Sequence, residues 1–146
     1  MGNRLYFDAV QVGDLLPPLI KRPSTQQLVM YAGASGDFYP LHYDQEFARA
    51  QGLPGIIVHG ALKSAFLGQL VTDWIGVDGI LVELSVRYRE MDVPGDVLTC
   101  HGLIAEKRNE GRRNLVRCEL WIENGQTIRT TTGEALVDLP LRPPSG

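Results

Sequence analysis

The most continuous hydrophobic pattern in this chain lies between residues 60 and 75. Apolar residues there cover most of the circumference of a helix rather than a single stripe, and Gly76 ends the pattern. A helix that is hydrophobic nearly all round has to be buried on several sides. The sequence therefore predicts a long central helix that the rest of the chain encloses.

The second half of the chain alternates between apolar and polar residues with a period of two, which is typical of half-buried strands. Turn signals separate the alternating runs, and Asn124-Gly125 is the strongest hairpin signal among them. A long buried helix followed by antiparallel strands predicts an α+β fold with a sheet wrapped around a central helix. The candidate strands are residues 80–88, 97–107, 116–123 and 126–138.

The first half of the chain combines extended and helical signals. Residues 4–20 are typical of a strand or an extended lead-in. Ser24 and Gln27 form a candidate capping box for a helix that runs to about residue 34. After an ordered loop over residues 35–43, Asp44 is a candidate N-cap for a short helix over residues 45–51. No internal repeat or low-complexity linker interrupts this order, so we expect one domain over residues 1–146.

Composition restricts the classes of function. A net charge of −3 in 146 residues argues against nucleic-acid binding, because such domains usually carry a basic face. Cys100 and Cys118 stand in separate strand-like runs without a CxxC pair, so we expect two reduced core thiols and no metal site. The first residues lack a signal-peptide core, and the apolar run over residues 61–75 is too short to cross a bilayer. We therefore expect a cytoplasmic protein that is not bound to a membrane.

The chemistry in the sequence is concentrated in the loop over residues 35–43. Asp37 and His42 stand five positions apart across a turn that Pro40 restrains. A carboxylate and an imidazole held on a rigid loop can activate one water molecule. Gly60, at the start of the predicted central helix, offers a backbone N–H that can stabilise a developing negative oxygen. Together these groups suggest the addition or removal of water at an activated carbonyl compound.

The loop and the start of the central helix resemble the MaoC-like hydratase/dehydratase family of the hotdog fold. The family's loop reads approximately Ser-Gly-Asp-x-Asn-Pro-x-His-x-Asp, with Tyr39 standing here where the family usually has Asn. A His-Gly pair also opens the family's central helix. The matching segments are Ser35-Gly36-Asp37-Phe38-Tyr39-Pro40-Leu41-His42-Tyr43-Asp44, His59-Gly60, Val12-Gly13-Asp14 and Val93-Pro94-Gly95-Asp96.

The resemblance implies reversible hydration of 2-enoyl thioesters and dehydration of (R)-3-hydroxyacyl thioesters. It implies an Asp37–His42 dyad that shares one water, and no metal or other cofactor. The thioester would be an acyl-CoA or an acyl carrier protein derivative. The chain would form a homodimer, or a heterodimer with a related hotdog subunit. The expected catalytic residues are Asp37, His42 and Gly60, and the expected substrate-binding residues are Tyr39, Ser64 and His59.

Several residues also have a purely structural interpretation. Asp37 could close an Asx-turn, and Asp44 is expected to be a helix cap rather than a catalytic acid. His59 is expected to anchor the start of the central helix through hydrogen bonds, and Tyr31 is expected to pack near the loop. Two other functions remain open at this stage: a hotdog thioesterase, or a non-catalytic hotdog subunit of a heteromeric dehydratase.

Overall fold

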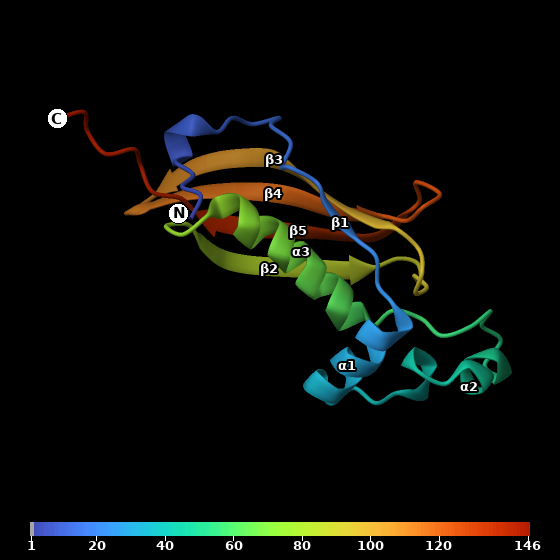
Figure 1. The fold of residues 1–146 in the computed structure, drawn as a ribbon. Coiled ribbons are helices and arrows are strands. Elements are labelled where there is room, and N and C mark those ends of the chain that lie inside the picture. The colour runs from blue at the N-terminus through green and yellow to red at the C-terminus, as the bar shows by residue number, and fades with distance from the viewer. Residues whose placement is uncertain (1) are drawn as a thin grey trace.

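The structure, a computed structural model that describes residues 2–146, is organised around helix α3 (Gly60–Ile75). The helix lies along one face of a curved sheet (Figure 1). Met1, the first residue of the predicted domain, lies outside the described residues. The predicted sheet around a long central helix is confirmed, with the helix bounds as expected. The buried residues of α3 are Leu62, Lys63, Phe66, Leu67, Leu70, Val71 and Ile75.

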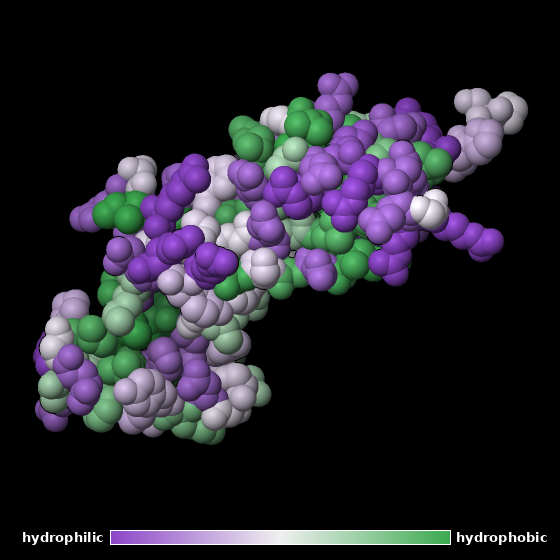
Figure 2. All heavy atoms as spheres, turned by 180° about the vertical axis from the view of Figure 1, so that it is seen from behind, coloured by the Kyte–Doolittle hydropathy of each residue, from purple (hydrophilic) through white to green (hydrophobic). Residues whose placement is uncertain are grey.

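The sheet has five antiparallel strands in the order β1-β3-β4-β5-β2. All four strands predicted in the second half of the chain are present, because their alternating residues place one apolar face against α3. The strands are β1 (Leu19–Lys21), β2 (Ile80–Tyr88), β3 (Leu98–Glu110), β4 (Arg113–Glu123) and β5 (Arg129–Asp138). The face of the sheet turned away from α3 is mostly hydrophilic (Figure 2).

The burial of α3 is incomplete. Ala61, Ala65 and Gln69 follow one another at a spacing of four residues on a face that stays exposed in the single chain. Burial on several sides was predicted, and in this chain alone the prediction is wrong for that face. Ala61 and Ala65 are small, so the first two turns of this uncovered face have room for the close approach of another element.

Strand β2 departs from simple alternation. The sequence groups Ile80 with Leu84 and Val86, but Ile80 is 61% exposed whereas the other two pack against the core. An irregularity in the register between Leu81 and Glu83 reverses the alternation. An extra residue in one strand moves the following side chains to the opposite face, which the sequence pattern did not indicate.

The two cysteines are buried free thiols, as predicted. They face the core from β3 and β4. Burial raises the pKa of the Cys100 thiol and of the Cys118 thiol to about 12. Both thiols therefore stay protonated near neutral pH and behave as small hydrophobic side chains.

Three short elements form a helical cluster at the N-terminal end of α3, beyond the end of the sheet (Figure 1). They are α1 (Thr25–Ser35), the 3₁₀ helix η2 (Pro40–His42) and α2 (Gln45–Ala50). Both N-caps are confirmed: Ser24 Oγ accepts from the Gln27 N–H at 3.1 Å, and Asp44 Oδ1 accepts from the Phe47 N–H at 3.0 Å. Of the predicted capping box, only the Ser24 half is present among the hydrogen bonds of residues 2–146. These caps fix where α1 and α2 begin, and hence where the loop between them lies.

The N-terminal lead-in is mostly irregular. Residues 4–20 were predicted to be a strand or an extended segment; β1 begins only at Leu19, and a 3₁₀ turn, η1 (Phe7–Ala9), precedes it. Isolated bridges join Arg4 to Gly76 and Leu15 to Leu103 of β3. In residues 2–146 we find no helix with both the length and the apolar character that crossing a bilayer requires.

The hairpin between β4 and β5 is present, but its strained residue is not the glycine. The Asn124 N–H donates to the Ile128 carbonyl, and the Thr127 N–H donates to the Asn124 carbonyl. Thr127 has φ +60°, in the left-handed region that a β-branched residue rarely adopts. The turn is thus longer than the two-residue turn that Asn-Gly usually forms.

We therefore expect Thr127→Gly to stabilise the protein by up to about 1 kcal/mol, because glycine adopts positive φ without steric cost. For a chain of this size, the melting temperature should rise by about 2–4 °C. The matched control is Gln126→Gly, at a neighbouring position without positive φ, which should lower the melting temperature. Equal effects of the two substitutions would show that the Thr127 backbone stores no strain.

Candidate active site

Asp37 and His42 face each other across the loop between α1 and α2. Asp37 Oδ2 lies 3.8 Å from His42 Nε2. The His42 side chain is 9% exposed and that of Asp37 is 46% exposed, so the imidazole forms the inner wall of the site and the carboxylate its outer rim. The predicted pairing of these two side chains is present in the structure.

A second contact fixes the orientation of the imidazole. His42 Nδ1 lies 2.8 Å from the carbonyl oxygen of Ile57, in the segment that leads into α3. A carbonyl can only accept, so Nδ1 carries the hydrogen and donates it. In the neutral ring the lone pair is then on Nε2, the nitrogen that faces Asp37. The Ile57 N–H also donates to the Leu41 carbonyl at 3.0 Å, which ties η2 to the same segment.

Asp37 uses its two carboxylate oxygens differently. Oδ1 accepts from the Tyr39 N–H at 3.4 Å, which is the Asx-turn contact considered above as a structural role. The Asp37 N–H donates to Ser35 Oγ at 3.2 Å. These contacts orient the carboxylate while Oδ2 remains directed at His42, so the turn and the pairing with His42 coexist.

His59 lies behind His42 and is completely buried. The two imidazole rings stack with centroids 3.8 Å apart and an interplanar angle of 20°, and Tyr31 packs edge-on against His59 at 4.9 Å. The expected packing of Tyr31 is confirmed. The expected hydrogen bonds of His59 are wrong: among residues 2–146 neither ring nitrogen has a partner. His59 supports the loop through ring packing.

The environment of His59 lowers the pKa of its imidazole. The main cause is burial, which disfavours the charged ring, and the neighbouring His42 adds to the lowering. The backbone of Asp37 and its carboxylate oppose the shift more weakly, and the backbone contact does not have hydrogen-bond geometry. His59 is therefore a neutral, apolar-like support for His42 near neutral pH.

Asp37, His42 and His59 are the three side chains of this region whose chemistry could hold a metal ion. Their ligand atoms lie within 4.8 Å of one another. An imidazole binds a metal in the plane of its ring at about 2.0–2.1 Å. The stacked rings of His42 and His59 are nearly parallel, so their in-plane lone pairs do not converge on one point. His42 Nδ1 is also engaged with Ile57, and the arrangement does not fit a metal centre.

Gly60, the first residue of α3, follows His59 directly, so the helix N-terminus begins beside the stacked rings. A side chain on Gly60 would meet the ring of Tyr88 at 2.9 Å. The Tyr88 hydroxyl lies 2.6 Å from Ser64 Oγ, one turn further along α3. Tyr88, at the end of β2, thus forms a wall of the site. The sequence did not indicate this role, because Tyr88 follows the alternating pattern of a half-buried strand.

Tyr39, the departure from the usual loop pattern, is 51% exposed. Its ring lies edge-on to His42 at 6.3 Å and to Phe47 at 6.0 Å. Tyr39 therefore borders the site next to the imidazole. His101, in contrast, lies on the sheet, where it stacks on Trp121 and contacts Glu123 at 3.6 Å, and it takes no part in the site.

The profile of the family described as "MaoC like domain" matches residues 11–132 of the chain. The chain belongs to the MaoC-like domain family. The matched region includes both loop residues, the whole of α3 and most of the sheet. The family expected from the loop and from the His-Gly pair is therefore confirmed.

Named relatives of this MaoC-like chain differ greatly in length. The chain is 30% identical over 123 residues to the (R)-specific enoyl-CoA hydratase of Aeromonas caviae, covering 84% of this chain and 90% of that protein. It is also 30% identical over 121 residues to the fatty acid synthase subunit beta of Saccharomyces cerevisiae, covering 82% of this chain but only 6% of that subunit. The similarity thus extends over most of one relative and over a small part of the other.

Solved structures show that the fold is shared. The (R)-hydratase from A. caviae involved in PHA biosynthesis aligns with a TM-score of 0.80 at 29% identity, covering 90% of this chain and 98% of that one. A chain of the ChsH1-ChsH2 complex from Mycobacterium tuberculosis aligns with a TM-score of 0.79 at 25% identity, covering 88% and 98%. The expected hotdog fold of this MaoC-like chain is confirmed.

The lowered pKa of His59 makes stability depend on pH. The folded pKa lies below the unfolded value of 6.5, so the stabilisation is fully present above pH 6.5. It is lost as the pH falls toward the folded pKa, because the unfolded chain then binds the proton more strongly. Each pH unit within that window costs about 1.4 kcal/mol.

We expect the urea midpoint of the native protein to decrease when the pH is lowered from 7.5 to 5.5. His59→Phe should make that decrease smaller. Phenylalanine retains a flat ring for stacking but cannot titrate. The control is Gln126→Ala in the hairpin between β4 and β5, which changes no titratable group and should retain the native pH dependence. An identical dependence in His59→Phe and in the native protein would exclude His59 as its source.

Proposed function

We propose that this chain catalyses the reversible hydration of 2-enoyl thioesters, which is the dehydration of (R)-3-hydroxyacyl thioesters in the other direction. The observation that carries the proposal is the pair formed by Asp37 Oδ2 and His42 Nε2 at 3.8 Å. This distance is too long for a direct hydrogen bond, but a single water can donate to both atoms. The name of the similar (R)-specific enoyl-CoA hydratase supports the same reaction class.

In the proposed mechanism, His42 accepts the proton of the shared water. The Nδ1 bond to Ile57 keeps the Nε2 lone pair directed at the water, and the Asp37 carboxylate stabilises the imidazolium that forms. The water oxygen bonds to Cβ, the C=C electrons move onto the thioester oxygen, and they return as Cα takes up the proton held by the dyad. General acid–base catalysis of this kind typically contributes about 10²–10⁴-fold.

The proposed oxyanion donor is the backbone N–H of Gly60. The first N–H groups of a helix have no partner within the helix and point toward its positive end. Negative charge on the thioester oxygen therefore has a suitable donor next to the dyad. Loss of one donor of this kind costs about 2.7–4 kcal/mol in the transition state.

The acyl thioester would lie between the dyad and the Ser64–Tyr88 pair. We assign Ser64, Tyr39 and His59 to the substrate-binding wall: Ser64 through its hydroxyl, Tyr39 at the outer edge, and His59 as the support behind His42. Coenzyme A and an acyl carrier protein both supply a thioester that this arrangement suits. We further propose that residues 1–146 act as one MaoC-like hotdog domain in the cytoplasm.

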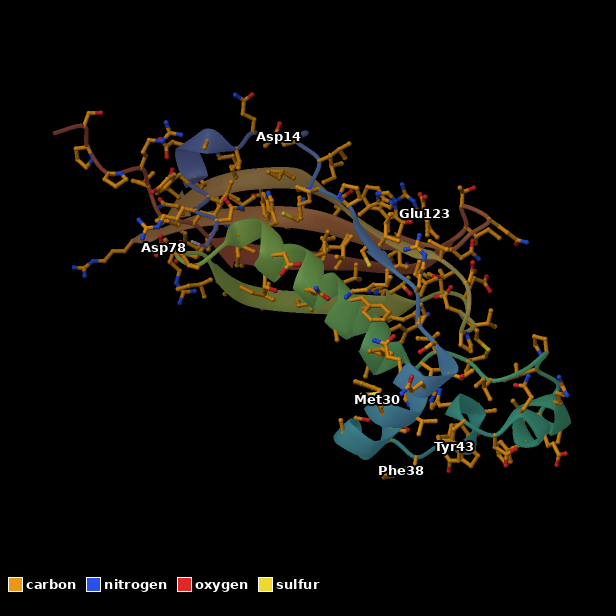
Figure 3. All side chains as sticks on the ribbon, viewed as in Figure 1. Asp14, Met30, Phe38, Tyr43, Asp78 and Glu123 are labelled. Atoms are coloured by element: carbon orange, nitrogen blue, oxygen red, sulfur yellow. The ribbon has the colours of Figure 1, made fainter. Side chains whose placement is uncertain are left out.

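The open edges of the chain support assembly as a dimer. The outer edge of the nine-residue strand β2 has no partner strand within residues 2–146, and exposed edges of this length are normally covered. Large apolar side chains are also exposed in the helical cluster, including Met30 at 66% and Phe38 at 59% (Figure 3). We propose a homodimer or a pair with a related hotdog chain; the similarity to one chain of the ChsH1-ChsH2 complex supports a pair of different chains.

Incubation with crotonyl-CoA should reduce the enoyl thioester absorbance without releasing free thiol. Asp37→Asn and His42→Ala should each lower kcat/KM at least about 100-fold, because the first removes the carboxylate charge beside the imidazole and the second removes the group that takes the proton of the water. The matched control is His101→Ala, which removes an imidazole from the sheet and should retain activity.

Release of free thiol would instead indicate a thioesterase. No turnover of short or long acyl chains, alone or with a partner hotdog chain, would indicate a non-catalytic subunit. Full activity of either dyad variant would remove that residue from the mechanism.

Gly60→Ala should lower kcat by about 10-fold or more, because the added Cβ would meet the Tyr88 ring at 2.9 Å and displace the helix start. Gly33→Ala is the matched control: Gly33 lies in α1, where an added Cβ meets nothing within 4 Å. Steady-state kinetics with crotonyl-CoA would measure both variants. Unchanged kcat in Gly60→Ala would argue against a role for the exact position of the helix start in catalysis.

A further inference from the structure

A buried charged network lies beneath the first turn of α3. Lys63, which is 2% exposed, donates from Nζ to Asp92 Oδ2 and to the Glu90 carbonyl, each at 3.0 Å. Thr130 of β5, which is fully buried, donates its hydroxyl to the same Asp92 oxygen at 2.6 Å. The network thus joins α3, the segment after β2 and strand β5.

Asp92 also holds the backbone that leads into the helix. Its carbonyl accepts from the Val58 N–H at 2.8 Å. One residue therefore binds the chain at Val58 through its backbone and at Lys63 through its side chain. His59 and Gly60 lie between these two attachment points, so Asp92 is bound to the chain on both sides of the helix N-terminus.

The same segment orients the imidazole of the dyad. Ile57, which precedes Val58, accepts the Nδ1 hydrogen of His42. A shift of residues 57–60 would move both the Gly60 amide and the acceptor that fixes the His42 tautomer. The two attachments at Asp92 therefore affect the position of the Gly60 amide and the orientation of the His42 imidazole.

Stability alone does not account for this network. Taking a lysine and an aspartate out of water is costly, and well-packed apolar residues are often at least as stable. A positive charge in the first turn of a helix is also unfavourable with respect to the helix dipole. Asp92 Oδ1, moreover, has no hydrogen-bond partner among residues 2–146. Stability is therefore a weak explanation for the network, whereas its contacts join three separate segments of the chain.

We propose that Lys63, Asp92 and Thr130 form a clamp that positions the His59–Gly60 segment for catalysis. The three are positioning residues, because they act through the backbone of residues 57–60 and not on the thioester. The inference rests on the proposed hydration reaction for its kinetic consequence. Its structural consequence, a restrained segment before α3, is independent of that reaction.

The test uses the double variant Lys63→Met/Asp92→Asn, which removes both charges together and leaves no unpaired buried ion. The matched control is Arg4→Met/Asp78→Asn, which makes the same two kinds of change at an exposed ion pair of 3.3 Å near the opposite end of α3. Thr130→Val, which keeps both charges, is the second clamp variant if the double variant does not fold. Far-UV circular dichroism verifies folding.

With crotonyl-CoA, the clamp variant should lose about 10- to 100-fold in kcat with KM within about twofold, because misplacement of catalytic groups by about 1 Å has effects of this size. The control variant should retain kcat. In amide hydrogen exchange, the peptide that covers residues 56–63 should exchange at least about tenfold faster in the clamp variant only, because the Val58 N–H loses its restrained acceptor.

Native exchange rates in a folded clamp variant would overturn the clamp, whether or not the protein hydrates crotonyl-CoA. Native kcat in a clamp variant, with an active parent protein, would overturn its role in catalysis. Absence of turnover in the parent protein would count against the proposed hydration reaction, while the exchange measurement would still decide whether the clamp restrains the segment.

Discussion

The hydrogen bond from His42 Nδ1 to the Ile57 carbonyl is the constraint on which the site depends. It joins the loop between α1 and α2 to the segment that begins α3, and it decides which nitrogen of the imidazole is free. Without it the ring could present an N–H to Asp37, and a water between them would lose one of its two acceptors. The stacked ring of His59 keeps the imidazole in that plane by packing alone.

The fold brings these groups together by burying α3 against the sheet. Its apolar residues hold the helix in place, and its N-terminus points into the helical cluster (Figure 1). Buried polar side chains are concentrated at this end: His42, His59, Lys63, Asp92, Thr130 and Thr131 are all below 9% exposure. The rest of the interior is apolar. The protein thus confines costly polar burial to the place where geometry matters for the proposed chemistry.

Much of the fold follows from local patterns in the sequence. The period of two over β4 and the caps at Ser24 and Asp44 are local signals, and each gave the element that the structure contains. The bulge in β2 and the exposed face of α3 could not be predicted in this way. A bulge depends on how two strands fit together, and an uncovered helix face depends on what else is present to pack against it.

In the candidate site, too, local features could be predicted from the sequence, whereas features that depend on tertiary contacts could not. The spacing of Asp37 and His42 indicated a pair because both residues lie in one short loop. Lys63 appeared in the sequence only as an interruption of an apolar run, since its partner Asp92 is 29 positions away. His59 was expected to anchor the helix start through hydrogen bonds; it does lie there as a support, but the tertiary fold surrounds it with the rings of His42 and Tyr31 instead of polar partners.

The central claim is that one water, held between Asp37 and His42 on one side of the substrate, supplies both the hydroxyl group and the new hydrogen. Hydration of crotonyl-CoA in D₂O, followed by NMR analysis of the product, tests it directly. Because both additions come from the same side, the deuterium at Cα and the oxygen at Cβ should be in the syn relationship. Anti addition, or a mixture of the two, would contradict the claim.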